Sequence, residues 1–278
     1  MITVSLKDES FRGGYSSNNG ILPVYSKYLE YDRNNIHPTI IYTEDHIIAS
    51  TVDQYPNHNN IAWLVDTKAI RSDAYNILLQ NIDKYNYILT HDLSIIDQIN
   101  VNNTKALFSI VGGCWIEETD RKIYDKTKNL SIIASWKNFT EGHKLRHSLI
   151  ENYRDLFNGV YGNGYCFIEN KIQALKDYRF SVVIENNICD DYFTEKLMDC
   201  IVTGTIPIYY GTDNIKNYFN IDGFITIKNE FEFVNKKHLF TEEFYMSKLK
   251  IIKENFEIAK NYVNTEDWVY LKYKKIFF

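Results

Sequence analysis

The chain has few of the residues that would indicate a disulfide framework, a zinc site or a membrane span. Its four cysteines, Cys114, Cys166, Cys189 and Cys200, lie far apart and form no Cys-x-x-Cys pair, so we expect them to pack as small buried hydrophobes. No apolar run approaches the roughly 20 residues of a transmembrane helix, and residues 1–14 do not read as a signal peptide. We therefore expect a soluble protein of a bacterial or virus-infected host cytoplasm.

A strong charge of either sign is also missing. The chain has 31 Lys and Arg residues against 36 Asp and Glu residues, which gives a formal net charge of −5. A chain without a global positive field is not expected to hold nucleic acid, so small molecules or neutral polymers are the expected partners. The length of 278 residues, with 45% hydrophobic residues, favours two domains, each with its own core.

The sequence does contain a regular alternation of strand and helix patterns. Apolar runs typical of buried strands fall at residues 2–6, 39–45, 60–65, 86–91, 106–113, 130–136, 178–185 and 205–210. Helical patterns begin near Pro23 and occupy residues 72–85, 93–100, 142–157 and 194–203. Such alternation predicts parallel sheets covered by helices on both faces. A charged stretch without periodicity follows Trp115, so we expect two α/β domains, residues 1–120 and 121–278.

The C-terminal tail combines an amphipathic helical pattern with a basic and aromatic end. The last nine residues read YLKYKKIFF. Such an end suits peripheral contact with a membrane surface, and the alternative is that it packs back on the protein.

Residues 182–211, VVIENNICDDYFTEKLMDCIVTGTIPIYYG, carry more polar chemistry than a turn between two strands requires. A strand ends near Asn186, and Thr194 is a suitable N-cap for the next helix, whose N-terminus would attract phosphate. Lys196 in the first helical turn opposes the helix dipole unless an anion binds beside it, and the Glu195 carboxylate suits two vicinal ribose hydroxyls. The segment therefore predicts a nucleotide site, and a solvated helix start is the alternative.

The same segment resembles the donor-binding signature of the family 10 α-1,3-fucosyltransferases, in which FEN is followed by Tyr, TEK, a helix and G-T-x-P-x-Y-x-G. The matching residues are Glu185, Asn186, Tyr192, Thr194, Glu195, Lys196, Gly204, Pro207, Tyr209 and Gly211. Two departures are IEN in place of FEN and the acidic loop 189–191. The donor-binding residues that the resemblance implies are Arg146, Glu185, Asn186, Tyr192, Thr194, Glu195 and Lys196.

Arg146 lies in GHKLRHSLIENY, which resembles the family helix that supplies an arginine to the donor diphosphate. A guanidinium grips phosphate oxygens and stays charged. His143 and His147 flank it, but HKLRH lacks the Glu of HExxH, so we expect no metal there. The family needs no metal-holding DxD triplet and none occurs here, although Asp190-Asp191 leaves a divalent ion as an alternative.

The first half of the chain resembles the family where the acceptor would be activated. Trp63 and Asp66 match the W-x-x-x-E-S-P region, shortened by one position, which implies Asp66 as the base that deprotonates the acceptor hydroxyl. The alternatives are a simple capping Asp66, His91 as the leading other base, and Glu44 and Asp45 as weaker ones. The acceptor-side residues that the resemblance implies are Trp63, Asp66, Thr90, His91 and Gly113.

Together these features predict an α/β protein of GT-B type, with two Rossmann-like lobes, parallel sheets and an inter-lobe cleft. The resemblance implies an inverting transfer of fucose from GDP-fucose to a glycan hydroxyl, with no cofactor, the acceptor on lobe 1–120 and the donor on lobe 121–278. The implied catalytic residues are Asp66, Arg146 and Lys196. The alternatives are a transferase of the same fold with another nucleotide sugar, and a non-catalytic relative that binds glycan or nucleotide.

Overall fold

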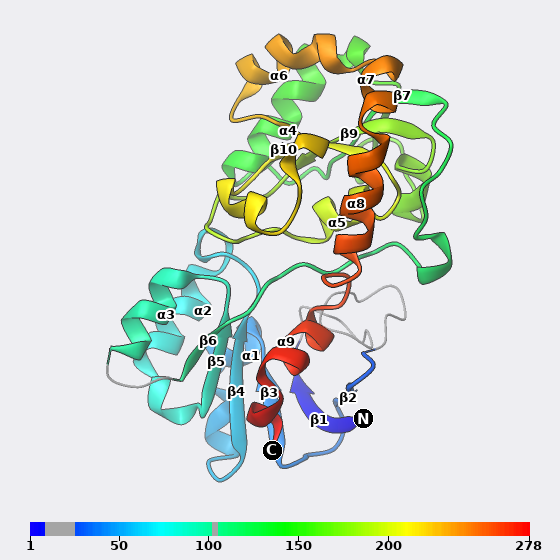
Figure 1. The fold of residues 1–278 in the computed structure, drawn as a ribbon. Coiled ribbons are helices and arrows are strands. Elements are labelled where there is room, and N and C mark those ends of the chain that lie inside the picture. The colour runs from blue at the N-terminus through cyan, green and yellow to red at the C-terminus, as the bar shows by residue number, and fades with distance from the viewer. Residues whose placement is uncertain (9–25, 102–104) are drawn as a thin grey trace. The chain divides into compact units, whose positions relative to one another are not determined.

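The computed structural model describes residues 1–8, 26–101 and 105–278 (Figure 1). The chain forms two compact units, each built on a parallel β-sheet. Unit 1 comprises Met1–Gly112, Cys189–Tyr192 and Asn264–Phe278, and unit 2 comprises Gly113–Ile188 and Phe193–Val263. The prediction of two α/β lobes with parallel sheets is confirmed.

The sheet of unit 1 has the strand order β2-β1-β3-β4-β5-β6, and all of its pairs are parallel. Its strands are β1 (Ile2–Lys7), β2 (Leu29–Asp32), β3 (Thr39–Tyr42), β4 (Asn59–Leu64), β5 (Tyr87–Thr90) and β6 (Ala106–Phe108). Its α-helices are α1 (Glu44–Ile48), α2 (Lys68–Gln80), α3 (Leu93–Asn100) and α9 (Thr265–Tyr273), with short 3-10 turns at Thr51–Gln54, Ile82–Lys84 and Lys274–Phe277. Parallel strands joined by helical crossovers are the arrangement that the alternating sequence pattern predicts.

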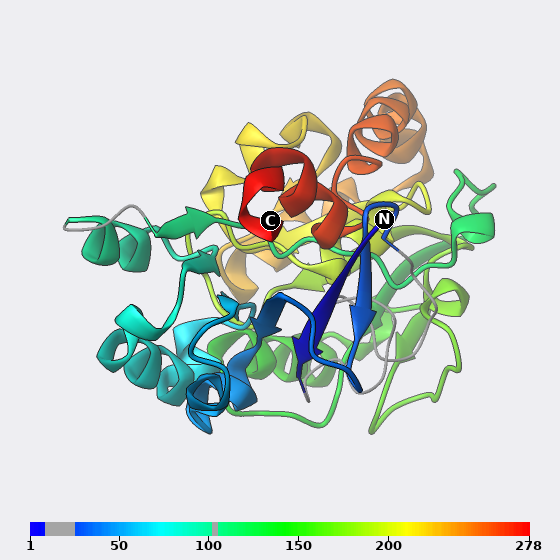
Figure 2. The same cartoon turned by 90° about the horizontal axis from the view of Figure 1, so that it is seen from below.

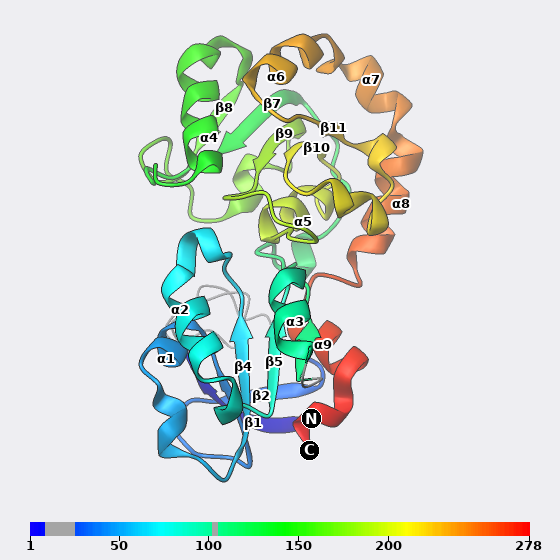
Figure 3. The same ribbon diagram turned by 90° about the vertical axis from the view of Figure 1, so that its left-hand side faces the viewer.

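Helices cover the unit 1 sheet on both faces. One core cluster joins residues of α1, α2 and α3 to strand residues such as Ile40 and Ala62. A second cluster joins the C-terminal residues Val269, Ile276 and Phe277 to the alternate strand residues, among them Ile41. Figure 3 shows α2 and α9 on opposite sides of β4 and β5. Because successive strand residues point to opposite faces, the apolar runs of these strands serve both clusters.

The N-terminal segment differs from its predicted helix. The helix expected to begin near Pro23 starts outside the described residues, and its described end forms β2, which pairs in parallel with β1 through Ile2 and Leu29 (Figure 2). Leu29 is buried in the core of unit 1. Pairing with a sheet edge and burial of this leucine outweigh the local helical pattern.

The domain limits also differ from the predicted division at residue 120. The first segment of unit 1 ends at Gly112, and Asn264–Phe278 also belongs to unit 1 although it follows unit 2 in the chain. Asp267 accepts hydrogen bonds from the Ser26 hydroxyl and the Lys27 N–H, and Val269 packs in the unit 1 core. The basic tail therefore packs on the protein. Within the described ranges, no helix is both long enough and apolar enough to cross a membrane.

The sheet of unit 2 has the parallel strand order β11-β10-β9-β7-β8. Its strands are β7 (Lys128–Ile133), β8 (Gly159–Tyr161), β9 (Tyr178–Ile184), β10 (Ile206–Tyr210) and β11 (Ile225–Thr226). Its α-helices are α4 (Glu141–Asn152), α5 (Glu195–Ile201), α6 (Glu230–Lys236), α7 (Glu242–Ser247) and α8 (Leu249–Ala259). Short 3-10 turns lie at Glu118–Asp120, Arg154–Leu156, Lys171–Ala174, Asp213–Asn217, Ile221–Gly223 and Lys237–Leu239.

The core of unit 2 forms between the sheet and its helices. Leu149 and Ile150 of α4 pack with Phe180 of β9, and Phe233 of α6 lies in the same cluster. The cysteine prediction holds for Cys114 and Cys200, which are buried, but Cys189 is only half-buried and Cys166 is exposed. The sheet and its helices thus form the packed core of unit 2. Polar residues can lie beyond the carboxyl ends of its strands, where ligands of such sheets bind.

Candidate nucleotide-sugar site and candidate base

A cavity of about 320 Å³ opens in unit 2 where several strands end. Ile133 and Ala134 at the end of β7, Gly162 after β8 and Ile184 at the end of β9 line it. Its charged and polar lining includes Lys137, His143, Arg146, Lys171, Asn186, Glu195, Lys196 and Asp199. Ligands of open α/β sheets bind at the carboxyl ends of the strands, so the position and the lining of this cavity both suit a polar ligand.

Helix α4 approaches the end of β9 closely because residue 142 is glycine. A Cβ atom at Gly142 would lie 1.9 Å from the carbonyl oxygen of Glu185, and the Gly142 N–H donates to the Asn186 carbonyl at 3.3 Å. A capping box fixes the first turn, in which the Thr140 hydroxyl accepts from the His143 N–H and the His143 ring accepts from the Thr140 N–H. His143 therefore has a structural role at the cavity wall.

Arg146 lies one turn further along α4 and is buried. Its Nε donates to the Ile184 carbonyl at 3.1 Å, its Nη2 also donates to that carbonyl, and Nη2 donates to Asn186 Oδ1 at 2.8 Å. These bonds hold the guanidinium at the end of β9, where it lines the cavity. A fixed, permanently charged fork in a polar cavity suits a phosphate ligand.

Glu185 secures the start of α5. Its fully buried carboxylate accepts from the Thr194 N–H at 2.9 Å and from the Thr194 hydroxyl at 2.8 Å. The Thr194 hydroxyl in turn accepts from the Lys196 N–H at 3.3 Å. Burial raises the pKa of Glu185, and Lys196, whose Nζ lies 3.8 Å from it, opposes this. Glu185 and Thr194 thus connect the end of β9 to the helix that carries Glu195 and Lys196.

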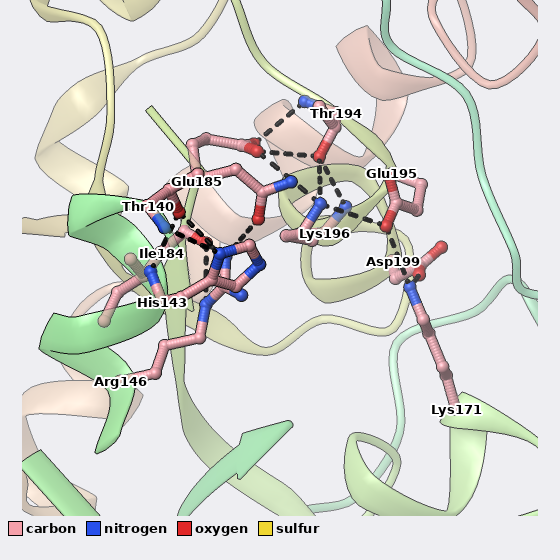
Figure 4. A network of polar contacts seen from close by, with 11 residues as sticks. Thr140, His143, Arg146, Lys171, Ile184, Glu185, Thr194, Glu195, Lys196 and Asp199 are labelled. Carbon is pink, nitrogen blue, oxygen red and sulfur yellow. Dashed lines mark hydrogen bonds and ion pairs between the residues drawn. The ribbon is translucent and has the colours of Figure 1, made fainter. Parts of the chain in front are cut away.

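Four side chains of alternating charge continue this network along the cavity (Figure 4). Glu195 Oε1 lies 3.3 Å from both Lys196 Nζ and Lys171 Nζ, and Lys171 Nζ lies 2.9 Å from Asp199 Oδ2. Burial would raise the pKa of Glu195, but the two lysines lower it to about 2. Burial would lower the pKa of Lys171, but Asp199 and Glu195 raise it. Glu195 and Lys171 are therefore charged at neutral pH, and an incoming anion meets the ordered side chains of Lys171 and Lys196.

Lys171, Asp199 and Trp115 are residues of this site that the sequence analysis missed. Lys171 Nζ lies 4.0 Å from the centre of the Trp115 ring, and Asp199 Oδ1 accepts from the Trp115 N–H at 2.6 Å. Asp199 follows Glu195 by four residues, so its place on the same face of α5 was readable from helical spacing. Lys171 and Trp115 come from distant segments, and only the tertiary structure brings them to the cavity.

Unit 1 holds four of the five residues expected on the acceptor side, Trp63, Asp66, Thr90 and His91. Asp66 follows β4 and is half-buried, and its backbone N–H donates to Glu44 Oε1 at 2.9 Å. Glu44 is buried, and burial together with Asp66 raises its pKa to about 7. Trp63 is only 2% exposed and packs in the core, so the structure places it away from any binding surface. Its position within β4 explains this, because both faces of that sheet are covered.

Of three further predicted residues, Thr90 lies in unit 1, the expected unit, whereas Gly113 and Tyr192 each belong to the other unit from the one expected. The buried Thr90 hydroxyl accepts from the Asp92 N–H at 3.1 Å. Gly113 belongs to unit 2, has a φ of 81° and donates its N–H to the Tyr262 carbonyl at 3.0 Å. Tyr192 is grouped with unit 1, apart from the other predicted donor-binding residues. The structure thus assigns Gly113 a backbone role at a left-handed position that favours glycine.

Tyr192 and His91 pack against each other within unit 1. Their ring centres are 4.8 Å apart, and both residues are buried. Within the described part of the chain, neither ring nitrogen of His91 has a hydrogen-bond partner. The neighbouring Asp191 has a φ of 56°, a left-handed conformation that Asp tolerates better than most residues, which gives one conformational reason for an acid in this loop. Among the described residues, no three His, Cys, Asp or Glu side chains gather to hold a metal ion.

The stability of the protein is expected to depend on His91 under acid conditions. Burial lowers the pKa of His91 to about 4, and Asp92 opposes this in part. A histidine whose pKa falls on folding stabilises the fold above its unfolded pKa of about 6.5, and about 3 kcal/mol is lost as the pH falls to about 4. His91→Phe keeps a ring against Tyr192 and should remove this loss. Urea unfolding of both proteins at several pH values measures it, and an unchanged pH dependence in the variant would contradict it.

Solved structures with the same architecture identify the class of fold. An α1,3-fucosyltransferase with GDP aligns with a TM-score of 0.53 at 15% identity, over 94% of this chain and 90% of that chain. A structure of an α1,3-fucosyltransferase with GDP-fucose gives a TM-score of 0.52 at 16% identity, with the same coverage. TarM gives 0.58 at 11% identity, over 86% of this chain and 54% of that one. The fold is therefore the GT-B fold of glycosyltransferases.

The sequence then assigns the family. Residues 123–268 match the profile of glycosyltransferase family 10 (fucosyltransferase), C-terminal part, and the chain belongs to this family. The α-(1,3)-fucosyltransferase B of Drosophila melanogaster is 35% identical over 65 residues, which are 23% of this chain and 13% of that protein. The α-(1,3)-fucosyltransferase FucT of Helicobacter pylori is 35% identical over 60 residues, 22% of this chain and 13% of that protein. These matches thus cover only a small part of the relatives' length.

Proposed function

We propose that this protein is an inverting glycosyltransferase that transfers fucose from GDP-fucose to a hydroxyl of a glycan. The observation that carries the proposal is the unit 2 cavity, in which Lys171 and Lys196 lie beside Glu195 and Arg146 supplies a third cationic group to the lining. Cationic side chains bind the phosphate oxygens of a diphosphate, and a carboxylate accepts hydrogen bonds from ribose hydroxyls. Membership of a fucosyltransferase family and the GDP and GDP-fucose complexes of structures with this fold support the choice of donor.

Arg146 and Lys196 would stabilise the charge that develops on the leaving nucleotide. As the bond between the anomeric carbon and the β-phosphate oxygen breaks, the electron pair stays on GDP. The two cations stabilise the negative charge that develops on the phosphate. Both are held before the donor arrives, Arg146 by Ile184 and Asn186 and Lys196 by Glu195. Such preorganised charges need no rearrangement at the moment of reaction.

Asp66 would complete the reaction as the general base. Its carboxylate would take the proton of the acceptor hydroxyl while that oxygen forms a bond to the anomeric carbon from the face opposite GDP, which inverts the configuration. Asp66 and Asp45 are half-buried, whereas the other candidate bases Glu44 and His91 are fully buried. Accessibility therefore favours Asp66 over Glu44 and His91. The ion pair of Asp45 with Arg71 makes Asp45 the weaker of the two half-buried candidates.

A transferase that uses another nucleotide sugar is the second candidate. The observation that favours it is the likeness of the fold to TarM, of which one structure contains UDP, at a TM-score of 0.56 and 11% identity. The charged residues of the cavity suit phosphate and ribose, which GDP-, UDP- and ADP-sugars share. Thermal unfolding with GDP, UDP and ADP and their sugars separates the candidates, because a ligand that binds only the folded state raises the melting temperature. We expect GDP and GDP-fucose to give the largest increase, and a larger increase with UDP would overturn the donor assignment.

Lys196→Ala is expected to weaken both GDP binding and transfer. The variant loses a charge-assisted contact worth about 1.5–3 kcal/mol, which corresponds to about 10- to 100-fold in affinity. The substitution also removes the positive charge that lies 3.8 Å from the Glu185 carboxylate and 3.3 Å from the Glu195 carboxylate. Calorimetric titration with GDP measures the loss. Lys216→Ala, at an exposed lysine of the same unit, is the matched control, and equal affinities of the two variants would argue against the phosphate role of Lys196.

A further inference from the structure

Two exposed aromatic rings lie on the loop that joins β7 to α4. Trp136 is 68% exposed and Phe139 is 59% exposed. Both belong to the segment whose residues Ser135 and Lys137 line the unit 2 cavity. The Phe139 ring also lies 4.6 Å, between ring centres, from the His143 ring, which is part of the cavity wall. The two rings therefore flank the cavity without being buried in it.

The backbone that carries these rings is held in place. His147 of α4 joins two loops, since its Nδ1 lies 2.7 Å from the Tyr165 hydroxyl and its Nε2 lies 3.0 Å from the Lys137 carbonyl oxygen. The loop after β8 lies against the first loop, because a Cβ atom at Gly164 would be 3.5 Å from the Trp136 Cβ. Gly162 is packed more tightly, since a Cβ atom there would lie only 2.1 Å from the Ala134 carbonyl oxygen. Rings presented on a fixed loop lose little entropy when a ligand binds.

The sequence of this loop indicates what kind of ligand the rings would meet. Trp136 and Phe139 are separated by Lys137 and Asn138, which are both exposed. A lipid surface or a hydrophobic protein face would require a continuous apolar patch. Aromatic faces interrupted by hydrogen-bonding groups instead match a pyranose ring, which has apolar C–H faces and hydroxyl groups around its edge. Aromatic side chains also offer a large apolar area with few rotatable bonds.

We propose that Trp136 and Phe139 form a saccharide-stacking rim that binds the acceptor glycan beside the donor cavity. The inference rests on the proposed transferase function. When the polar residues of the cavity hold the donor, Trp136 and Phe139 remain accessible to the acceptor glycan that approaches the opening of the cavity. It adds acceptor recognition to unit 2, whereas the family resemblance implied that recognition on the first lobe alone.

The experiment measures saccharide and nucleotide binding separately. Saturation-transfer NMR with the GDP-saturated protein uses two neutral disaccharides as probes, 4-galactosyl-N-acetylglucosamine and lactose. The first is the acceptor unit in the name of the Bos taurus relative, a 4-galactosyl-N-acetylglucosaminide 3-α-L-fucosyltransferase that is 29% identical over 92 residues. We expect the double variant Trp136→Ala/Phe139→Ala to bind the better probe at least about 10-fold more weakly, and Trp136→Phe to retain most of the affinity. Calorimetry should give the same GDP affinity for all variants.

Phe231→Ala is the matched control, since Phe231 on α6 is 72% exposed and belongs to the same unit. The proposal is overturned if the rim variant binds the disaccharides as well as the parent does, or if the GDP-bound parent binds neither of them. It is also overturned if the rim variant loses GDP affinity, which would assign the rings to the donor. Failure of the parent to bind GDP is a different result, because it would refute the proposed function itself.

Discussion

Replacement of Asp66 by asparagine is expected to lower the rate of transfer about 100- to 10,000-fold, the range that general-base catalysis contributes. Asparagine keeps the size of the side chain but cannot take a proton at neutral pH. The backbone of Asp66 is held independently of its carboxylate, because its N–H donates to Glu44 and its carbonyl accepts from the Tyr75 hydroxyl at 3.1 Å. The fold of this turn should therefore survive, and GDP binding in unit 2 should be unchanged.

The control for Asp66→Asn is the same change at a nearby carboxylate. Asp45 forms an ion pair with Arg71, with Arg71 Nη2 2.9 Å from Asp45 Oδ1, and Asp45→Asn should retain most of the transfer rate. Release of GDP from GDP-fucose with a glycan acceptor measures turnover, and calorimetry measures GDP affinity. A fully active Asp66→Asn protein would show that another group accepts the proton, and His91→Phe would then be the next variant to assay.

Gly142→Ala is expected to lower GDP affinity by about 10- to 100-fold, because displacement of Arg146 removes a charge-assisted contact worth about 1.5–3 kcal/mol. The added methyl group would lie 1.9 Å from the Glu185 carbonyl oxygen, and a backbone atom cannot rotate away as a side chain can. Overpacking of this kind costs about 1–3 kcal/mol, which exceeds the gain of about 1 kcal/mol in helix propensity. Helix α4 must therefore move from the end of β9, and the contacts of Arg146 with Ile184 and Asn186 move with it.

Lys144→Ala provides the comparison on the same helix, because Lys144 is exposed. That variant should keep the stability and the GDP affinity of the parent to within experimental scatter. Urea unfolding and calorimetric titration of the two proteins test the pair. Equal GDP affinities for Gly142→Ala and Lys144→Ala would mean that the close approach of α4 to β9 does not position the donor site.

The sequence pattern predicted the parallel sheets well where apolar runs are bounded by polar turns. Residues 60–65, 178–185 and 205–210 read as buried strands, and β4, β9 and β10 cover nearly the same residues. Leu29–Asp32 did not read as a strand because its pairing with β1 is a contact between distant segments. The docking of α9 on unit 1 was hidden for the same reason.

The candidate site was predictable to the extent that its residues are close in the chain. Glu185, Thr194, Glu195 and Lys196 lie within one contiguous motif, and the structure joins them in one network. Local sequence could not indicate that Lys171 would reach Glu195, nor that the Trp63 side chain would enter the core. Residues that meet only through tertiary packing leave no periodic signal in a single sequence.

The place of Asn264–Phe278 in unit 1 has a consequence for the order of folding during synthesis. Unit 2 lies between two segments of unit 1 in the chain, so the ribosome completes unit 2 before it releases the residues that cover one face of the first sheet. Until Val269, Ile276 and Phe277 arrive, their partners Ile41 and Trp63 lack this cover. The nascent first unit is thus the part of the chain that would recruit a chaperone, because exposed apolar sheet faces promote aggregation.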